Sequence, residues 1–301
     1  MKTNDLHLPP KLCLKNTFAF AFILLSFIGK ATTYTALTNG NWDDDATWSG
    51  VGIPGAADDV VIEDGKTITV NISNAACNSL SLGTGGLLTA ACTLSFSSST
   101  SQLTTGSIQF GALLSTCTLD MSNGGTISSS DWTVSNANFI YGTGTVKFTG
   151  TFTLPNDTNF NTFYNLEILS GTTTLSRSTS ILNDITMSGT GILNASTQSL
   201  AVGGNWTQSG TASFTEGTQT VTFNGSGDQY INHTSTETFY NLIVNKPAGA
   251  FYLSTGNISI TSLMTISSSG VVDLGTNTLD GPGGLTMLNG DLQIGQLSSV
   301  C

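Results

Sequence analysis

The chain has 301 residues, of which only 9% are charged, and its formal net charge is −11. Ordinary soluble domains carry about 25% charged residues, so hydroxyl and amide side chains must supply most of the surface polarity. Hydrophobic residues make up 39% of the chain and alternate with Ser and Thr, which excludes a disordered protein. Nucleic acid and anionic lipid are excluded as partners, because phosphate binding needs clustered Lys and Arg.

Residues 1–31 have the pattern of a secretory signal peptide. Three lysines precede an apolar run at 18–28, and the small residues Gly29 and Ala31 follow as a cleavage site. A membrane anchor is the weaker interpretation, since the run has about half the length that a membrane-spanning helix needs. We therefore expect a secreted or cell-surface protein without a membrane span. Without this segment, 18 acidic residues face four basic ones, a net charge of −14.

Residues 32–72 have a composition of their own, with two of the four tryptophans, Trp42 and Trp48. The end of a stack of strands exposes an unpaired edge and an open core. We therefore predict that residues 32–72 form an N-terminal cap and the first coils of the fold that follows.

Seven acidic residues fall in the predicted cap: Asp43, Asp44, Asp45, Asp58, Asp59, Glu63 and Asp64. Ca²⁺ binds six to eight oxygen ligands, so a calcium ion that fixes the cap is one interpretation. No Asp-x-Asp-x-Asp-Gly loop is present, and neighbouring side chains on a strand point to opposite faces. We therefore expect a solvated acidic turn and no cofactor, with calcium as the alternative.

Short runs of alternating apolar and polar residues recur along the rest of the chain, with Gly, Ser, Asn and Thr between them. This alternation predicts β-strands, and no long stretch has the 3.6-residue periodicity of a helix. The predicted strands are 60–62, 67–72, 80–82, 93–96, 107–110, 145–148, 166–168, 220–223, 242–244 and 258–260.

Two stretches of the chain share one pattern. The phrases that begin at Trp132, Gly142 and Phe163 recur at Trp206, Gly217 and Phe239, so the offset grows by only one position from each phrase to the next. The unit is about 75 residues long, which is longer than a propeller blade and shorter than a sandwich domain. Three or four coils of a solenoid, each of about 18–25 residues, fit the unit best.

The repeat therefore predicts an all-β fold, a right-handed parallel β-helix (solenoid) with an N-terminal cap. Residues 73–301 would form the solenoid repeats, with copies at about 132–205 and 206–280, and the chain after residue 31 would make about 13 coils. Apolar side chains would point inward and Thr, Ser and Asn outward, so that stacked coils share one core.

Three cysteines, Cys77, Cys92 and Cys117, each precede a short alternating strand, so we expect them to form one internal column. A disulfide between two of them is one interpretation, because an exported protein meets an oxidising compartment. We expect the simpler arrangement, in which buried free thiols act as small apolar groups.

The search for catalytic residues gives no constellation. Glycoside cleavage needs two carboxylates around the scissile bond or a basic residue, and Glu167, Arg177 and Asp184 are the nearest candidates, which we interpret as surface charges. His233 is the only histidine after residue 31; no Gly-x-Ser-x-Gly turn accompanies it, and we expect it in a solvent-exposed turn. We therefore assign no catalytic, cofactor-binding or metal-binding residue.

The four tryptophans, Trp42, Trp48, Trp132 and Trp206, are candidates for stacking on sugar rings. For the repeat-equivalent pair, Trp132 and Trp206, we expect packing in the core or at a corner instead.

The motif Trp42-x5-Trp48-Ser-Gly and the phrases 204–207, 217–225 and 239–242 resemble the secreted β-helix surface proteins of the Bacteroidetes. The resemblance extends over nearly all of the chain after residue 31. It implies a parallel β-helix displayed or released outside the cell. Such proteins usually end in a sorting domain for the type IX secretion system, and this chain stops at Cys301 without one, so we expect a truncated C-terminus.

These patterns together predict a secreted or cell-surface, adhesin-like structural scaffold that is not an enzyme. Glycans or surface proteins are the expected partners. The alternative is a carbohydrate-binding or polysaccharide-degrading β-helix.

Overall fold

The structure is a computed structural model that describes residues 31–83, 90–111 and 116–293. The chain divides into two units, Met1–Lys30 and Ala31–Cys301, and every described residue belongs to the second. Apart from Ala31, the expected signal peptide therefore lies outside the described residues. Cys301 also lies outside them. In the described part of the chain, no helix is long and apolar enough to cross a bilayer.

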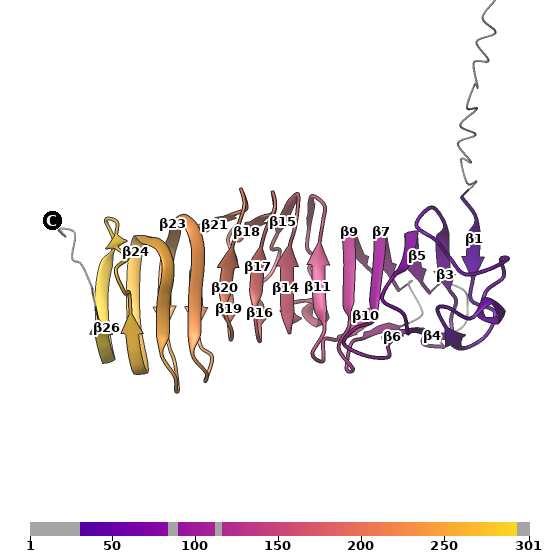
Figure 1. Cartoon of the computed structure of the whole chain (residues 1–301), viewed down its shortest axis with the longest axis horizontal. Helices are drawn as coiled ribbons and strands as arrows, with labels where there is room; N and C mark the ends of the chain where they lie inside the picture. Colours follow the sequence, from indigo (N-terminus) through magenta and orange to yellow (C-terminus); the bar gives the residue numbers. More distant parts are fainter. Residues whose placement is uncertain (1–30, 84–89, 112–115, 294–301) are drawn as a thin grey trace, which may run out of the picture. The chain divides into compact units, whose positions relative to one another are not determined.

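The described residues form an all-β solenoid of about 11 turns, and its strands lie side by side in parallel (Figure 1). This confirms the predicted fold class. Among the described residues, three sheets run along the solenoid, with 17, five and four strands. The same ranges contain two 3-10 helices between strands, η1 (Asp45–Thr47) and η2 (Thr158–Phe160).

The 17-stranded sheet contains β1 (Thr33–Thr35), β3 (Asp59–Ile62), β5 (Ala75–Leu82), β7 (Gln102–Phe110), β9 (Thr126–Val134), β11 (Thr145–Phe148), β13 (Thr162–Phe163), β14 (Asn165–Ile168), β16 (Thr179–Ile181), β17 (Ile185–Met187), β19 (Leu200–Val202), β20 (Trp206–Gln208), β22 (Thr220–Phe223), β23 (Gln229–Val244), β24 (Phe251–Asp273), β25 (Leu279–Asp280) and β26 (Gly284–Gln293). The five-stranded sheet contains β2 (Gly40–Asn41), β4 (Thr67–Val70), β6 (Thr93–Phe96), β8 (Cys117–Asp120) and β10 (Ala137–Ile140). The four-stranded sheet contains β12 (Phe152–Thr153), β15 (Thr172–Thr174), β18 (Ile192–Asn194) and β21 (Ser213–Thr215).

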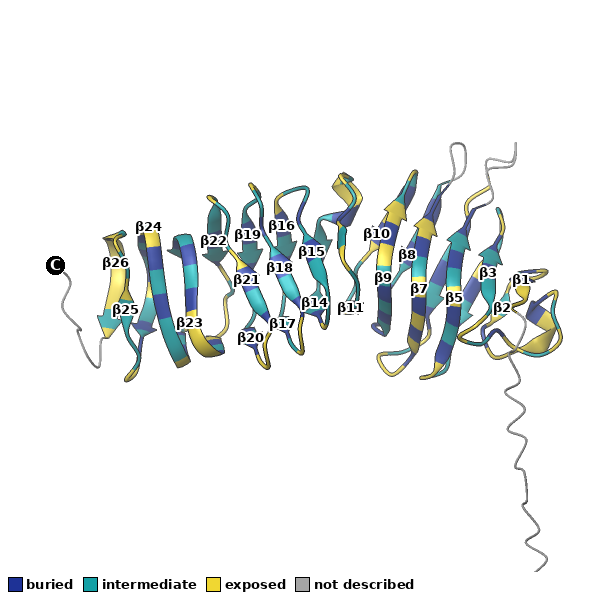
Figure 2. Ribbon diagram, turned by 90° about the horizontal axis from the view of Figure 1, so that it is seen from above, coloured by how far each residue is buried: buried dark blue, intermediate teal, exposed yellow. Residues whose placement is uncertain are grey.

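Apolar side chains alternate with polar ones along the strands and point into a single core. β3 and β11 each show the sequence intermediate, buried, intermediate, buried, and the same banding appears on most strands (Figure 2). Each fully buried Val, Leu or Ile contributes roughly 1.5–3 kcal/mol. The last described strand, β26, is mostly exposed.

Matching positions of successive coils stack in columns through the backbone ladder. The first column consists of Val146, Leu166, Ile185, Trp206 and Ile231. The second column consists of Phe163, Ile181, Val202, Phe223 and Val244.

The length of a coil changes along the solenoid. Between Val146 and Trp206 the first column advances by roughly 20 residues a coil, the short end of the range for solenoid repeats. Nearer the N-terminus the coils are longer, since Ala75 stacks on Leu103 and Leu103 on Ile127. Longer coils explain why the chain makes about 11 turns, fewer than expected.

The segment predicted as a cap already stacks as coils. β1 pairs with β3, and β2 pairs with β4. Between β1 and β3 the chain turns back on itself, and Ala36 bridges to Trp48 in an antiparallel manner. The Trp48 indole N–H donates to the Trp42 carbonyl at 2.9 Å, and the two rings pack edge to face at 5.2 Å. Both rings are buried, so they fill the core where the stack begins.

The two sequence copies preserve one internal aromatic cluster. In each copy the tryptophan packs against three phenylalanines of the same copy. The first cluster is Trp132 with Phe139, Phe148 and Phe163, and its ring centroids lie 5.2–6.5 Å apart. The second is Trp206 with Phe214, Phe223 and Phe239, with centroids 5.0–6.2 Å apart. The predicted core packing of both tryptophans is confirmed.

Equivalent residues of the two copies nevertheless occupy different columns. Leu166 lies in the first column, whereas its counterpart Leu242 pairs with Val221 and Met264 beside the second column. Three coils separate Val146 from Trp206. The sequence offset between the two copies is longer than these three coils and ends partway through the fourth. The second copy is therefore displaced by part of a turn around the core.

The repeated Gly-Thr phrase has a steric cause. Gly142 and Gly217 have φ of +49° and +63°, a conformation that other residues adopt at a cost. A Cβ on either would collide with a backbone carbonyl of the preceding coil, that of Met121 or Ser196. Each copy therefore needs glycine at this corner.

Candidate functional site

The charged residues considered for catalysis do not come together. Glu167 pairs with Lys147 at 2.7 Å on the outer face. The Arg177 guanidinium donates to the Asn156 side chain at 3.0 Å. Asp184 lines a different hollow from Arg177, and Glu167 lines neither.

Three of the seven acidic residues of the N-terminal segment fix its turns. Asp44 accepts the Ala46 N–H, Asp45 accepts the Gly52 N–H, and Asp58 accepts the Gly55 N–H, at 2.6–3.0 Å. Within the described ranges, no group of three or more His, Cys, Asp or Glu side chains is placed to hold a metal ion. The acidic residues considered for calcium therefore do not form such a group, and calcium binding stays a prediction.

The tryptophans are not available to sugars, because all four are buried. Their exposed fractions are 0% for Trp42 and Trp206 and 3% for Trp48 and Trp132. The sugar-stacking interpretation was therefore wrong for Trp42 and Trp48, whereas Trp132 and Trp206 pack in the core as expected.

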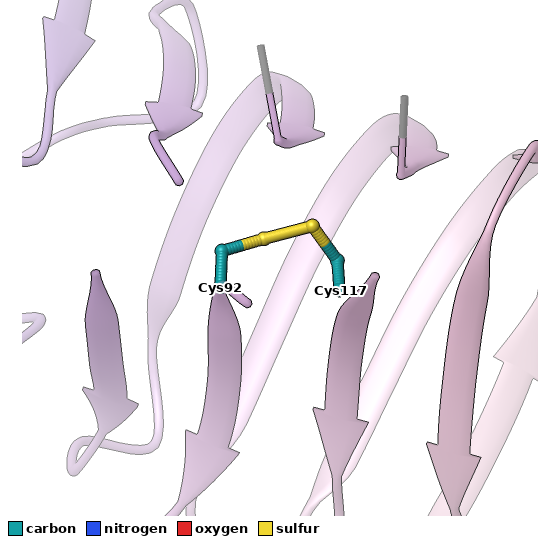
Figure 3. The surroundings of a disulfide bond; sticks show 2 residues. All are labelled: Cys92 and Cys117. Carbon is teal, nitrogen blue, oxygen red and sulfur yellow. A yellow bond between two sulfur atoms is a disulfide. The ribbon is translucent and has the colours of Figure 1, made fainter. Parts of the chain in front are cut away.

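The cysteine prediction was wrong for two of the three residues. Cys92 and Cys117 form a disulfide between neighbouring strand ends (Figure 3). Cys92 lies just before β6 and Cys117 is the first residue of β8. The two strands pair in register, Thr93 with Thr118, so the two Cα atoms lie 4.6 Å apart, within the range that a disulfide spans. Cys77 is a buried free thiol, as expected, but it lies in β5 beside Thr105 and not in the same column.

His233 is buried, with 2% of its surface exposed, and the expectation of an exposed turn was wrong. It lies within β23, where Ile231, His233, Glu237 and Phe239 are all buried. Burial lowers the pKa of His233 and raises that of Glu237 to about 8. Burial thus favours the neutral form of both groups. Neither residue lines the hollows that contain Asp184, Tyr230 or Arg177, so we interpret them as core residues.

Lys246 is a buried cation, with 1% of its residue surface exposed. Its ammonium donates to the Gly225 and Gly227 carbonyls and to the Gln229 side-chain oxygen, at 2.6–3.0 Å. Burial lowers its pKa. Through these three hydrogen bonds, Lys246 holds residues 225–229 against the next coil.

A line of outward side chains crosses five successive coils, and we call it the outer ladder: Asn165, Asp184, Asn205, Tyr230 and Tyr252. Each of the first four lies one position before a member of the first column. The last two, Tyr230 and Tyr252, pair directly with each other. Side-chain oxygens of Asn165, Asp184 and Asn205 each accept the backbone N–H of the next member, at 2.7–3.2 Å. The two tyrosine rings then stack at 5.0 Å and 13°.

Two hollows flank the outer ladder. The larger, of about 540 Å³, is lined by Asp184, Asn205 and Asp228 among others. The smaller, of about 290 Å³, is lined by both tyrosines, Asp273 and Asn277 among others. Neither lining contains Lys or Arg. This surface is the candidate binding site, and sequence reasoning missed it because Tyr230 and Tyr252 have no motif.

Comparison with protein-family models, curated proteins and solved structures gives no match. The fold therefore defines the class of protein, a parallel β-solenoid, and the resemblance to Bacteroidetes surface proteins stays a prediction.

Proposed function

We propose that this chain is an exported structural protein whose β-solenoid acts as an adhesin-like scaffold outside the cell or on its surface. The observation that supports it best is the continuous stack of coils with a single shared core. Such a stack presents a long, regular surface and needs no reaction centre. The signal-peptide pattern of residues 1–31 and the Cys92–Cys117 disulfide support export, because disulfides persist in oxidising compartments.

Cell fractionation tests this proposal. We expect the protein in the medium or on the surface, accessible to protease added to intact cells and shortened by the signal peptide. Deletion of residues 1–31 should retain it in the cytoplasm. Finding the full-length wild-type protein in the cytoplasm would refute the proposal.

The second candidate is a carbohydrate-active protein, and the hollow that contains Asp184 and Asp228 favours it. Cleavage is tested by the release of reducing or unsaturated ends from plant and algal polysaccharides. We expect none. Turnover that disappears in Asp184→Asn or Asp228→Asn would replace the scaffold proposal with an enzymatic one.

A further inference from the structure

The outer ladder changes character between its third and fourth members. Asn165, Asp184 and Asn205 are short side chains, each tied to the backbone of the next coil. Tyr230 and Tyr252 are long, and Tyr230 is 38% exposed. The two stacked rings lie on the outer surface, and we call this pair the Tyr230–Tyr252 ridge. On either side lie shorter residues, Asn205 at the coil before Tyr230 and Asp273 in the hollow beside Tyr252.

The groups beside the ridge are rigid hydrogen-bond acceptors. One oxygen of Asp184, Asp228 and Asp273 accepts a backbone N–H at 2.7–2.9 Å. The second oxygen of each makes no hydrogen bond in the described part of the chain. A carboxylate fixed in this way can accept from a ligand hydroxyl with little further loss of side-chain entropy.

The charge of this surface limits the ligand. Three carboxylates and no Lys or Arg line the two hollows, so a uronate, a sulfated glycan or a phosphate would be repelled. A divalent cation is also disfavoured, because no three acidic side chains come together among the residues described. The ligand that fits this surface best is therefore a neutral one that is rich in hydroxyl donors and presents an apolar face to an aromatic ring.

The geometry also indicates an extended ligand. The outer ladder runs from coil to coil, and four coil steps span roughly 19 Å. A polymer lying along this line would contact several coils at once.

We propose that the outer ladder binds a neutral polysaccharide, with sugar rings packed against the Tyr230–Tyr252 ridge and hydroxyls donated to Asp228 and Asp273. This deepens the proposed function, since it rests on the chain being an extracellular scaffold and names the ligand class of its surface.

The test is binding of the purified protein to immobilised glycans: neutral β-glucans, xylan and mannan, anionic alginate and pectin, and cationic chitosan. We expect binding to at least one neutral glycan and none to the anionic ones. Tyr230→Ala/Tyr252→Ala should weaken binding by about tenfold or more. Asp273→Asn, which keeps one acceptor oxygen, should weaken it by a few-fold. Tyr240→Ala is the matched control, because Tyr240 lines neither hollow, and it should bind as the wild type does.

Equal binding by the wild type and the double tyrosine variant would overturn the proposal, as would an absence of neutral-glycan binding. Binding to chitosan alone, lost in Asp273→Asn but unchanged in the tyrosine variant, would also overturn it and indicate a general acidic surface. Circular dichroism of each variant checks the fold. A folded, exported protein without glycan binding would refute this inference and leave the scaffold proposal intact, whereas a cytoplasmic protein would refute the scaffold itself.

Discussion

The Cys92–Cys117 disulfide should stabilise the coils around it by a predictable amount. The two residues have a sequence separation of 25, and the entropy of closing a loop of that length corresponds to about 3.5 kcal/mol at 25 °C. We therefore expect Cys92→Ala/Cys117→Ala, or the wild type under a phosphine reductant, to lose about 3 kcal/mol of local stability. Cys77→Ala is the matched control, since it removes a buried thiol without a cross-link and should cost only about 1 kcal/mol.

Hydrogen exchange by mass spectrometry is the appropriate assay, because a stacked solenoid need not unfold in one step. Peptides from β6 to β9 should lose protection in the double variant, while peptides from β19 to β24 should keep theirs. Alkylation of the denatured, unreduced wild type should label Cys77 and leave Cys92 and Cys117 unlabelled. Labelling of all three, or an effect no larger than that of Cys77→Ala, would refute the reasoning.

Three further predictions concern the buried residues. Burial raises the pKa of Glu237 from 4.5 to about 8. Its contribution to the free energy of unfolding is therefore complete below pH 4.5 and falls as the pH rises to 8, by up to about 5 kcal/mol. Urea titrations of Glu237→Gln should lack this loss, and a variant whose stability depends on pH as the wild type's does would refute the prediction. Lys246→Met leaves three acceptors without their donor and should cost about 3 kcal/mol of local stability. Hydrogen exchange at residues 225–229 should be faster in this variant. Unchanged exchange there would show that the Lys246 hydrogen bonds do not stabilise the segment. Trp206→Ala should cost about 3–5 kcal/mol of local stability, seen as faster hydrogen exchange in β19 to β23, whereas Val51→Ala, at a residue that is 96% exposed, should leave exchange unchanged; equal exchange in the two variants would refute the prediction.

The strands were predictable because their alternation is local information. The predicted strands at 93–96, 145–148 and 220–223 coincide with β6, β11 and β22. In each, an apolar residue at every second position faces the core, and no knowledge of distant contacts is needed to see that. The expected strand 80–82 is only the end of β5. The strand begins with Ala-Ala-Cys, where apolar and polar residues do not alternate clearly.

The errors arose where the answer depended on register between coils. Cys77 and Cys92 are separated by less than one coil, whereas the sequence separation of Cys92 and Cys117 is 25, about one coil in this part of the chain. Spacing alone could therefore have paired the correct two. For His233, counting in steps of two from Ile231 gives an inward position, but the polar neighbours Asn232 and Thr234 suggested a turn. The same count from Phe239 and Val244 places Glu237 and Lys246 inward, but charged side chains are rarely buried, so the pattern alone did not reveal their burial.

The repeat itself places limits on where a binding function can lie. Its two copies share an aromatic cluster in the core, so the repeated residues explain packing. Because the second copy is displaced by part of a turn, repeated residues do not line up on one face and cannot build a continuous external site. Tyr230 falls near Leu154 and Pro155 in the first copy, so it has no aromatic counterpart there. The outer ladder is continuous across coils although its members are not repeat equivalents. A surface that recruits unrelated positions into one line is therefore where a function beyond folding is best sought.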